Sequence, residues 1–457
     1  MGTDVRRDDP RAAVGSSRRE TGDEWRPTAM GWKASVGRLS WALYDWANSP
    51  FTTLIVTFIF PAYFQAAVVG DPVKGQAIWG YVIAGSGILI AIVAPPLGAI
   101  ADVGGSRKPW VLVFTAICAV ASALLWFVFP SPAFLGFAVV CVVIANVGFE
   151  FGVVFNNAML PDLTPPSRLG RLSGWAWGLG YAGGLTALTL ALLVLSRPGA
   201  APLGLDRQAA EDVRIIGPLV GIWLLVFSMP LFLFTWDRSR TSVPLAAAVR
   251  SGLAATQETF ADLRKHRHVL RFLLAHMIYA DGLVALFAFG GLYASGVFNL
   301  SVPEVIRFGI ALNVAAGLGA FSFAWIDDWL GSKRTIVLAL IGLIISSLAA
   351  IAAHSVTWLW VAGIGIGLFV GPAQAASRSL MARLSPPEKE AQYFGLFALS
   401  GRATSFVGPA LVAVATDMFG SQRVGLASIL ILFVIGLLML LLVEEPQTPE
   451  LIGRTHI

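Results

Sequence analysis

Long apolar stretches dominate this 457-residue chain and restrict the folds that it can adopt. About twelve of them are long enough to cross ~30 Å of hydrocarbon as an α-helix, at 1.5 Å per residue. With 56% hydrophobic and only 13% charged residues, the chain is predicted to be an all-α integral membrane protein. The predicted spans are residues 39–68, 77–101, 109–129, 133–160, 172–195, 215–236, 269–295, 304–327, 335–353, 356–380, 391–416 and 424–443.

Lysine and arginine residues fall mainly in alternate connections between these spans. The connections on the side of the N-terminus are rich in both residues, whereas the opposite connections hold few. By the positive-inside rule, we expect both termini in the cytoplasm and a multi-pass location in the cytoplasmic membrane of a bacterium. The net charge of +5 then reflects topology and contact with anionic lipid, because no nucleic-acid-binding module is visible. We expect a monomer that binds a small-molecule substrate and membrane lipid.

A loop motif of an acid, glycine, serine and two cations follows the second predicted span and recurs after the eighth. A Leu-Thr-Pro-Pro segment after the fourth span likewise recurs as Leu-Ser-Pro-Pro after the tenth. Both repeats are offset by about 220 residues, so the chain is predicted to form two homologous six-helix halves that rock about a central cavity. The copies of the loop motif are Asp102, Gly105, Arg107 and Lys108 in the first half, and Asp328, Gly331, Lys333 and Arg334 in the second.

This repeat gives the predicted organisation of the chain. Residues 1–38 mix arginines with acids and lack an apolar core, so they fit a disordered tail or a lipid-binding switch rather than a signal peptide. The predicted parts are a cytoplasmic tail (1–38), the first half (39–236), a cytoplasmic linker (237–268), the second half (269–443) and a second cytoplasmic tail (444–457).

The two loop motifs have two interpretations. A single charged turn would be explained by the positive-inside rule alone, whereas two copies in register favour a latch that holds the cytoplasmic side closed. In that latch, Asp102 and Asp328 would cap the N-terminus of the next helix or pair with a cation in the other half.

The first predicted span carries an unusual group of polar residues. Asp45, Asn48 and Thr52 recur at helical spacing, and Pro50, which cannot donate to the carbonyl of Trp46, predicts a kink. A buried unpaired carboxylate costs several kcal/mol, which makes Asp45 a functional candidate. Because Asp45 lies only ~9 Å into its span, we assign it to an inner gate.

The inner gate also draws residues from the fourth and tenth spans. Asn157 and Arg378 occupy equivalent positions in the two halves, where they could form a gate or, for Arg378, simply extend to the membrane surface. The candidate inner-gate residues are Tyr44, Asp45, Asn48, Asn156, Asn157 and Arg378.

The candidate substrate and coupling site centres on Asp281, which lies ~18 Å into the seventh span. It could carry a proton, balance a substrate amine or be satisfied by a neighbouring helix. Arg402, at a similar depth, is its expected partner, either as a permanent strut or as a clamp that substrate displaces. Glu150 could titrate in alternation with Asp281 or bond to polar neighbours. The candidates are Asp281, Tyr279, Arg402, Glu150 and Tyr181.

Motifs of other protein classes are missing from the sequence. It holds no nucleotide-binding loop, haem pair, metal-ligand spacing or nucleophile elbow, so we expect no cofactor and no metal, with a proton or sodium gradient as the available energy source. Cys118 and Cys141 lie singly within apolar spans and are interpreted as packing residues. A membrane-embedded enzyme with Asp281 or Glu150 as base, and a solute sensor without net transport, remain as alternatives.

The acid-glycine-basic loop with its second copy resembles that of the major facilitator superfamily. More narrowly, residues 41–49, 156–166 and 174–184 are similar to the unknown major facilitator family, the group that includes the autophagy-related vacuolar effluxer of amino acids. The resemblance covers about residues 39–443 and implies twelve helices in two halves. It also implies a secondary transporter that moves a small solute by alternating access, with amino acids and related metabolites among the candidates.

Overall fold

A computed structural model describes residues 32–104, 106–164, 169–195, 204–237, 266–384, 396–397, 400–401 and 403–444 of the protein. Gly105, Arg402, both predicted tails apart from a few residues and most of the predicted linker lie outside these ranges. The side chains of Asp102 and Asp328 also lie outside the description, although their backbone is helical.

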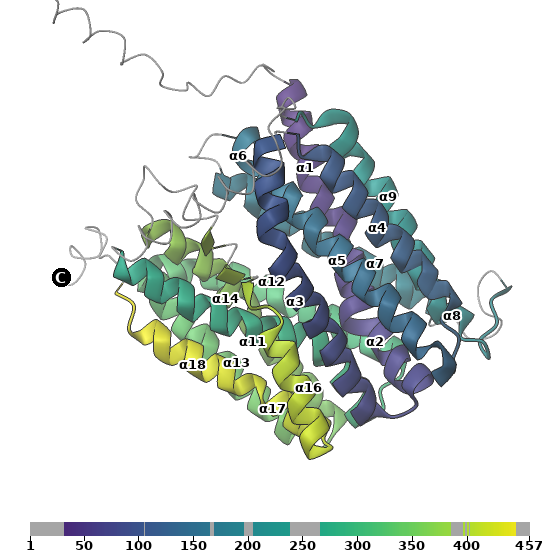
Figure 1. Ribbon diagram of the computed structural model, residues 1–457. Helices are drawn as coiled ribbons and strands as arrows, with labels where there is room; N and C mark the ends of the chain where they lie inside the picture. The colour runs from purple at the N-terminus through teal and green to yellow at the C-terminus, as the bar shows by residue number, and fades with distance from the viewer. Residues whose placement is uncertain are drawn as a thin grey trace, which may run out of the picture.

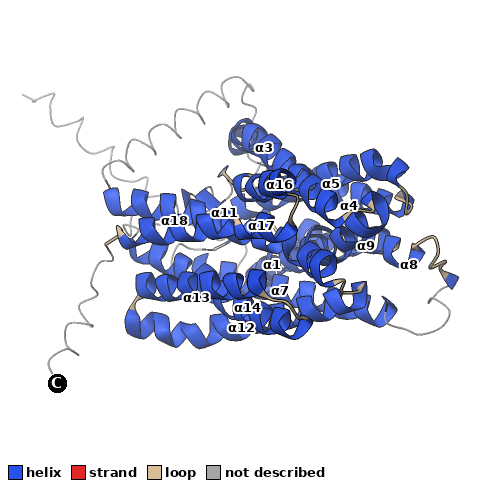
Figure 2. Cartoon of the chain, turned by 90° about the horizontal axis from the view of Figure 1, so that it is seen from below, coloured by secondary structure: helices blue, strands red, loops and turns tan. Residues whose placement is uncertain are grey.

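The described part of the chain contains helices and no strand (Figure 2). Eleven helices are long and apolar enough to cross a membrane, and a shorter apolar helix, α16 (Val407–Phe419), lies where the remaining span is expected. Large apolar side chains such as Leu233 and Phe321 stay exposed on the outside of the bundle, as expected where helices face lipid. The prediction of an all-α integral membrane protein is confirmed.

Both halves of the chain are built from helices within the described ranges. The first half comprises α1 (Trp32–Pro50), η1 (Phe51–Phe58), α2 (Ile59–Tyr63), η2 (Phe64–Val69), α3 (Pro72–Gly104), α4 (Lys108–Leu124), η3 (Leu125–Phe127), η4 (Pro132–Phe134), α5 (Leu135–Ala158), α6 (Leu160–Leu163), α7 (Leu169–Leu195), α8 (Glu211–Arg214) and α9 (Ile216–Phe234). The second half comprises α11 (Arg267–Phe298), α12 (Val302–Leu330), α13 (Ser332–Ala352), α14 (Val356–Leu384), α16, α17 (Gln422–Ala427) and α18 (Ile429–Leu441).

The long helices alternate in direction and therefore end at two opposite faces of the bundle. We call the face where α1 begins at Trp32 the first face, and the face where the chain turns at Gly70 the second face. Gly70 has a φ of 75°, a left-handed conformation that favours glycine. Figure 1 shows the two halves side by side, with α3 against α16, and α7 also contacts α12.

The first membrane helix changes geometry at Pro50, where the sequence predicts a distortion. The α-helical hydrogen bonding of α1 ends there, and the π-helical turns of η1 follow. Because proline has no amide hydrogen, the carbonyl of Trp46 loses its helical donor. The indole of Trp223 on α9 donates to that carbonyl at 3.3 Å and stacks on the Trp46 ring, with centroids 5.8 Å apart. Another helix of the same half thus satisfies the group that Pro50 leaves open.

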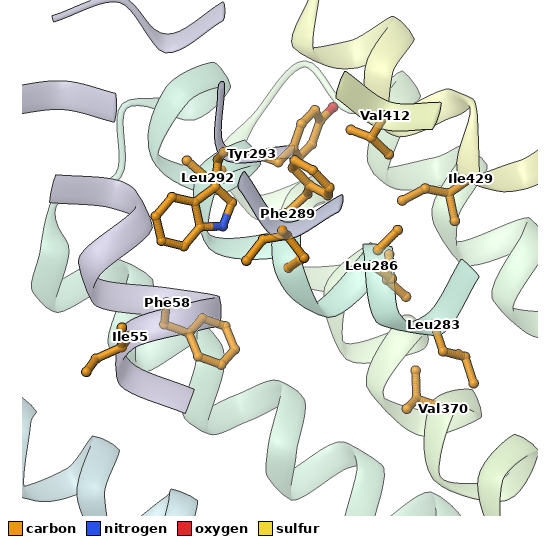
Figure 3. Close-up of a cluster of buried hydrophobic side chains, with 14 of the residues drawn as sticks. Ile55, Phe58, Leu283, Leu286, Phe289, Leu292, Tyr293, Val370, Val412 and Ile429 are labelled. Carbon is orange, nitrogen blue, oxygen red and sulfur yellow. The ribbon is translucent and has the colours of Figure 1, made fainter. Parts of the chain in front are cut away.

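A buried apolar cluster joins the two halves (Figure 3). Phe58 of η1 and Phe289 of α11 both belong to it and are almost fully buried. Gly291 allows the two segments to approach, since a Cβ at that position would lie 3.0 Å from the Cα of Phe58. Cys118 and Cys141 are free and buried, so their assignment as packing residues is confirmed.

Candidate functional site

A group of polar and aromatic side chains lies between the halves. Tyr181 of α7 donates its hydroxyl to Oε1 of Gln374 on α14 at 2.8 Å. One helical turn away, the guanidinium carbon of Arg378 lies 4.9 Å from the ring centroid of Trp177. The rings of Trp177 and Tyr181 are 6.1 Å apart. These contacts connect a helix of the first half to a helix of the second.

Asp45 of α1 completes this group with a negative charge. Its Cβ lies 3.5 Å from the position that a Cβ would take on Gly180, so the absence of a side chain there lets α1 approach α7. Asp45 and Arg378, which have opposite charges and come from different halves, therefore both lie beside α7. We call Asp45, Trp177, Tyr181, Gln374 and Arg378 the central cluster.

A small apolar cavity adjoins the central cluster at Tyr181. Its wall comes from η1, α7, α11, α12 and α14, and no charged residue is among those that line it. The amide of Asn313 in this wall donates to the carbonyl of Gly309 on its own helix, at 2.8 Å. The cavity therefore offers an apolar chamber beside a group of charged and hydrogen-bonding side chains.

Asp281, the predicted coupling acid, lies inside the second half. It is 2% exposed, and its backbone contacts Gly408 of α16, where a Cβ would be 3.0 Å from the Asp281 carbonyl carbon. Within the described ranges, Oδ1 of Asp281 has no hydrogen-bond partner. Arg402, its expected partner, lies outside those ranges, so the pair stays a prediction.

Other predicted coupling residues lie apart from the central cluster. Tyr279 is 1% exposed and shares a hydrogen bond of 2.6 Å with Ser377 of α14, next in sequence to Arg378. It therefore braces the helix that carries the central arginine. Glu150 is half-buried on α5 and has an electrostatic or hydrogen-bonding partner.

The predicted inner-gate residues divide into two groups. Asp45 and Arg378 belong to the central cluster, whereas Tyr44 and Asn156 hold α1 inside the first half. The Tyr44 hydroxyl and Thr115 Oγ1 are 2.8 Å apart, and the carbonyl of Asn156 accepts from the Trp41 indole at 2.8 Å. Asn48 is buried, while Asn157 is exposed.

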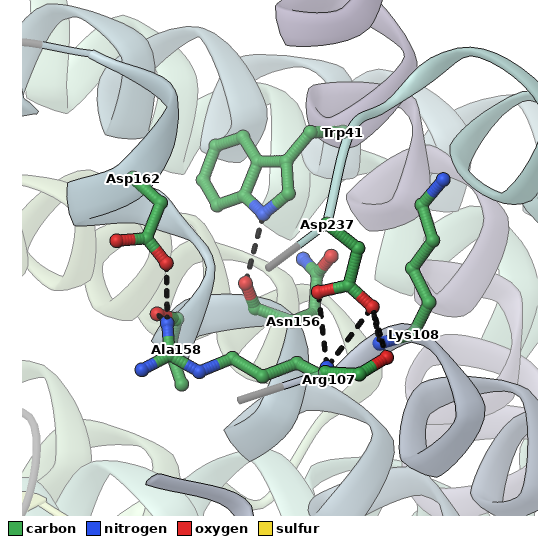
Figure 4. A network of polar contacts seen from close by, with 8 residues as sticks. Trp41, Arg107, Lys108, Asn156, Ala158, Asp162 and Asp237 are labelled. Atoms are coloured by element: carbon green, nitrogen blue, oxygen red, sulfur yellow. Dashed lines mark hydrogen bonds and ion pairs between the residues drawn. The ribbon is translucent and has the colours of Figure 1, made fainter. Parts of the chain in front are cut away.

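The first loop motif takes part in a polar network at the first face (Figure 4). Arg107 pairs with Asp162 of α6 at 2.9 Å and also donates to the carbonyl of Ala158. Asp237, just after α9, accepts from the backbone amides of Arg107 and Lys108 at 3.0 and 2.9 Å. Asp237 thus caps the N-terminus of α4, the role that the sequence suggested for Asp102.

An ion pair also lies beside the second loop motif, but here the acid precedes the loop and the arginine comes from another helix. The carboxylate of Asp327, at the end of α12, lies 3.9 Å from the guanidinium of Arg383 at the end of α14. Gly331 makes the turn to α13 with a φ of 88°, and Lys333 donates to the carbonyl of Leu441 at 3.0 Å. Arg334 is exposed. Each loop is therefore fastened within its own half.

Sequence reasoning missed Trp177, Gln374, Asp162 and Asp237. Trp177 and Asp162 lie inside the segments that resemble the unknown major facilitator family. The resemblance included these two residues but indicated no role for either. Gln374 and Asp237 carried no such signal. Their roles depend on partners far away in the chain, Tyr181 and the start of α4.

Comparisons with known proteins add independent information. A family model described as "Vacuole effluxer Atg22 like" matches residues 66–449. An uncharacterized MFS-type transporter of Bacillus subtilis, YxiO, is 27% identical over 417 residues, which cover 90% of this chain and 95% of that protein. Autophagy-related protein 22 of Coccidioides immitis is 25% identical over 455 residues, covering 82% and 74% of the two chains.

A solved structure of the same fold is that of a bacterial homolog to the human lysosomal transporter Spinster, in an inward-facing and unoccupied conformation. The TM-score is 0.66 at 15% identity, and the match covers 91% of this chain and 96% of that one. This likeness supports the twelve-helix fold with its two halves.

Proposed function

This chain belongs to the vacuole effluxer Atg22-like family of membrane transporters, and from that premise we propose that it moves a small solute through the central cluster by alternating access. The family model and the bacterial relative are described as transporters rather than enzymes. The observation that carries the proposal is the hydrogen bond of Tyr181 with Gln374, which joins the two halves in a cluster that also holds the oppositely charged Asp45 and Arg378.

The chemistry of the central cluster suits a solute that carries both charges. A guanidinium binds a carboxylate through two parallel hydrogen bonds, and a carboxylate binds an ammonium group. The wall of the adjoining cavity is apolar and suits contact with an uncharged part of the solute. Amino acids and related metabolites combine these features, and the matching family model is described as "Vacuole effluxer Atg22 like".

Alternating access needs contacts between the halves that can break. Tyr181 with Gln374 and Trp177 with Arg378 are such contacts, and a bound solute would compete for the polar atoms of all four. Rocking of the halves would then expose the central cluster to each face in turn. We further propose that a proton or sodium gradient drives the cycle, with protonation of Asp281 or Asp45 as the coupling step and Arg402 as counter-charge.

The distribution of charge supports a location and an orientation. Cations concentrate in the connections at the first face, which we propose to be cytoplasmic together with both termini. With a bacterial relative that covers nearly the whole chain, we propose the cytoplasmic membrane as the site of the protein and a monomer as the working unit.

The proposal is tested with purified protein. A thermal-shift screen of amino acids, peptides and sugars identifies ligands, because a ligand that binds only the folded state raises the melting temperature. Flux of each hit is then measured in proteoliposomes with and without a pH or sodium gradient. Flux that Asp45→Asn abolishes, and that Asp206→Asn on an exposed turn leaves unchanged, supports the proposal. Binding without flux would identify a sensor and reject transport.

A further inference from the structure

Three glutamines join the halves at the second face. Gln65 of η2 and Gln76 of α3 belong to the first half, and Gln422 of α17 belongs to the second. All three are buried, with exposed fractions of 1%, 0% and 4%. We call Gln65, Gln76 and Gln422 the amide seal.

Six hydrogen bonds of these side chains cross from one half to the other. Gln65 donates to the carbonyl of Leu292 at 2.8 Å and to the hydroxyl of Ser295 at 2.6 Å. Gln422 in turn donates to Oε1 of Gln65 at 3.1 Å and to the carbonyl of Pro72 at 2.9 Å. The Gln65 amide both donates and accepts, so this one side chain ties several helix ends together.

Gln76 makes the remaining two of these bonds. It donates to Thr416 Oγ1 at 2.8 Å and to the carbonyl of Gln422 at 3.2 Å. The helix ends of α16 and α17 are thereby tied to α3, whose first turn lies directly after η2. The three glutamines form one connected network rather than separate contacts.

A glycine lies against each glutamine and leaves no room for a side chain. A Cβ at Gly75 would overlap Gln65, and a Cβ at Gly296 would overlap the amide of Gln422. A Cβ at Gly425 would lie 2.8 Å from Nε2 of Gln76. The backbone on both sides therefore fits closely around the amides, which is typical of helices that approach through small residues.

The composition of the seal differs from that of the first face. Two ion pairs described there, Arg107 with Asp162 and Asp327 with Arg383, each lie within one half. The seal is built from neutral amides and hydroxyls and crosses between halves. Charged residues lie beside the seal without bonding to its amides: Asp417 accepts from Tyr81 at 3.3 Å on the exposed rim, and Arg423, next to Gln422, donates to the carbonyl of Ile351.

Neutral amides suit a closure that must open repeatedly. A seal made only of apolar side chains would expose apolar surface to water on every opening. Glutamine amides instead exchange protein partners for water, which makes the net free energy of each bond small. Several weak bonds acting together would then hold the second face closed. Loss of one residue would shift the equilibrium toward the open state without abolishing closure.

We infer that Gln65, Gln76 and Gln422 form the gate of the second face, and that the bonds between the halves break together when this face opens. The inference rests on the proposed alternating-access function. It assigns a gating role to residues that neither the loop motifs nor the central cluster include.

Thiol labelling tests the gate without any transported solute. Cys118 and Cys141 are replaced by alanine, and Gly290→Cys is introduced as reporter in the cavity wall, where a Cβ has nothing within 4 Å. A membrane-impermeant thiol reagent is applied to intact cells and, separately, to inverted membrane vesicles. We expect Gln76→Leu or Gln422→Leu to raise labelling from the second face by roughly 5- to 100-fold, from the bonds lost.

A matched control uses Gln208, an exposed glutamine in the connection at the same face. Gln208→Leu should leave the labelling rate unchanged. The gate is rejected if none of the seal substitutions raises the rate, or if Gln208→Leu raises it equally. It is also rejected if labelling rises equally from both faces, because that result indicates general loosening.

Cross-linking gives a second measurement, in which the two halves are tied together at the seal by a covalent bridge. Gln65→Cys and Ser295→Cys place two thiols at positions whose polar atoms are 2.6 Å apart across the halves. A short, reducible bifunctional thiol reagent should stop flux in proteoliposomes, and reduction should restore it. Flux that continues in the fully cross-linked protein would reject the gate.

The control pair joins two residues of the first half. Asn146 Nδ2 donates to Ser86 Oγ at 2.7 Å, so Ser86→Cys with Asn146→Cys can be cross-linked at a similar distance without tying the halves together. Flux should persist in this cross-linked variant. If flux is lost here too, its loss in the Gln65→Cys and Ser295→Cys variant would no longer support the gate. If no solute moves at all, the proposed function fails while the labelling experiment still decides the gate.

Discussion

Arg378 of α14 rests on the ring of Trp177 of α7, 4.9 Å from its centroid, so a cation of one half is held by an aromatic face of the other. A guanidinium over an indole gains about 0.5–2 kcal/mol, more when water is excluded. This contact keeps Arg378 oriented at the boundary between the halves while leaving its hydrogen-bond donors available. It defines the first prediction.

Trp177→Ala should weaken solute binding. Loss of a cation–π contact of about 0.5–2 kcal/mol corresponds to roughly a 2- to 30-fold rise in the apparent Kd, because Arg378 is no longer held in place. Trp177→Phe keeps an aromatic ring, so its apparent Kd should lie between those of the wild type and of Trp177→Ala. Binding is measured by thermal shift or calorimetry with a solute found in the screen.

Trp175 offers a matched control for this substitution. It lies two residues earlier on the same helix and is 65% exposed, on the side expected to face lipid. Trp175→Ala should leave binding unchanged. Equal effects of the two alanine variants would mean that Trp177 acts through helix stability rather than through Arg378.

Arg378→Gln should impair binding more strongly than loss of the ring. Hydrogen bonds to a charged partner contribute about 1.5–3 kcal/mol, so the apparent affinity for a carboxylate-bearing solute should fall by roughly 10- to 150-fold. Arg378→Lys keeps the charge but loses the planar pair of donors, and should recover only part of the affinity. Arg307→Gln, an exposed arginine of α12, is the control.

This series of variants separates recognition of a carboxylate by two hydrogen bonds from an effect of charge alone. If Arg378→Lys binds as well as the wild type, the arginine supplies charge alone and does not grip a carboxylate with two hydrogen bonds. If Arg307→Gln is equally impaired, the effect reflects the overall charge of the protein.

The fold could be predicted from the sequence to a large extent because the bilayer allows few alternatives. Apolar length identified the membrane helices, and Pro50 identified the place where α1 gives way to the π-helical η1. Depth was harder to predict, since α1 begins at Trp32, in a polar segment before the apolar run. Asp45 therefore lies deeper in its helix than the apolar boundary suggested.

The central cluster could be predicted only in pieces. Asp45, Tyr181 and Arg378 were all selected as charged or aromatic residues in membrane helices, but the sequence placed them in two separate sets. Their meeting depends on how α7 packs against the second half, which no local pattern encodes. Gln374 was missed for the same reason, because a neutral amide becomes informative only when its partner Tyr181 is known.

Asp237→Ala should destabilise the first half. Its carboxylate accepts from Ser106 Oγ at 2.7 Å and from the backbone amides of Arg107 and Lys108, so its loss uncaps α4. Loss of a helix N-cap costs about 0.5–2 kcal/mol, which should lower the midpoint of denaturant unfolding in detergent. Asp206→Ala, in an exposed turn, is the control. Unchanged unfolding of Asp237→Ala would show that the cap contributes nothing measurable.

Two neighbouring glycines of α11 give the sharpest test of packing between the halves. A Cβ at Gly291 would lie 3.0 Å from the Cα of Phe58 and closer still to the carbonyl of Thr57, whereas a Cβ at Gly290 would meet nothing within 4 Å. Gly291→Ala should therefore push η1 away from α11 and destabilise the protein by about 1–3 kcal/mol, as overpacking does. Gly290→Ala gains helix propensity and should be neutral or stabilising by up to about 1 kcal/mol. Both are compared by denaturant unfolding, and similar stability of the two variants would contradict the close approach of the halves at this position.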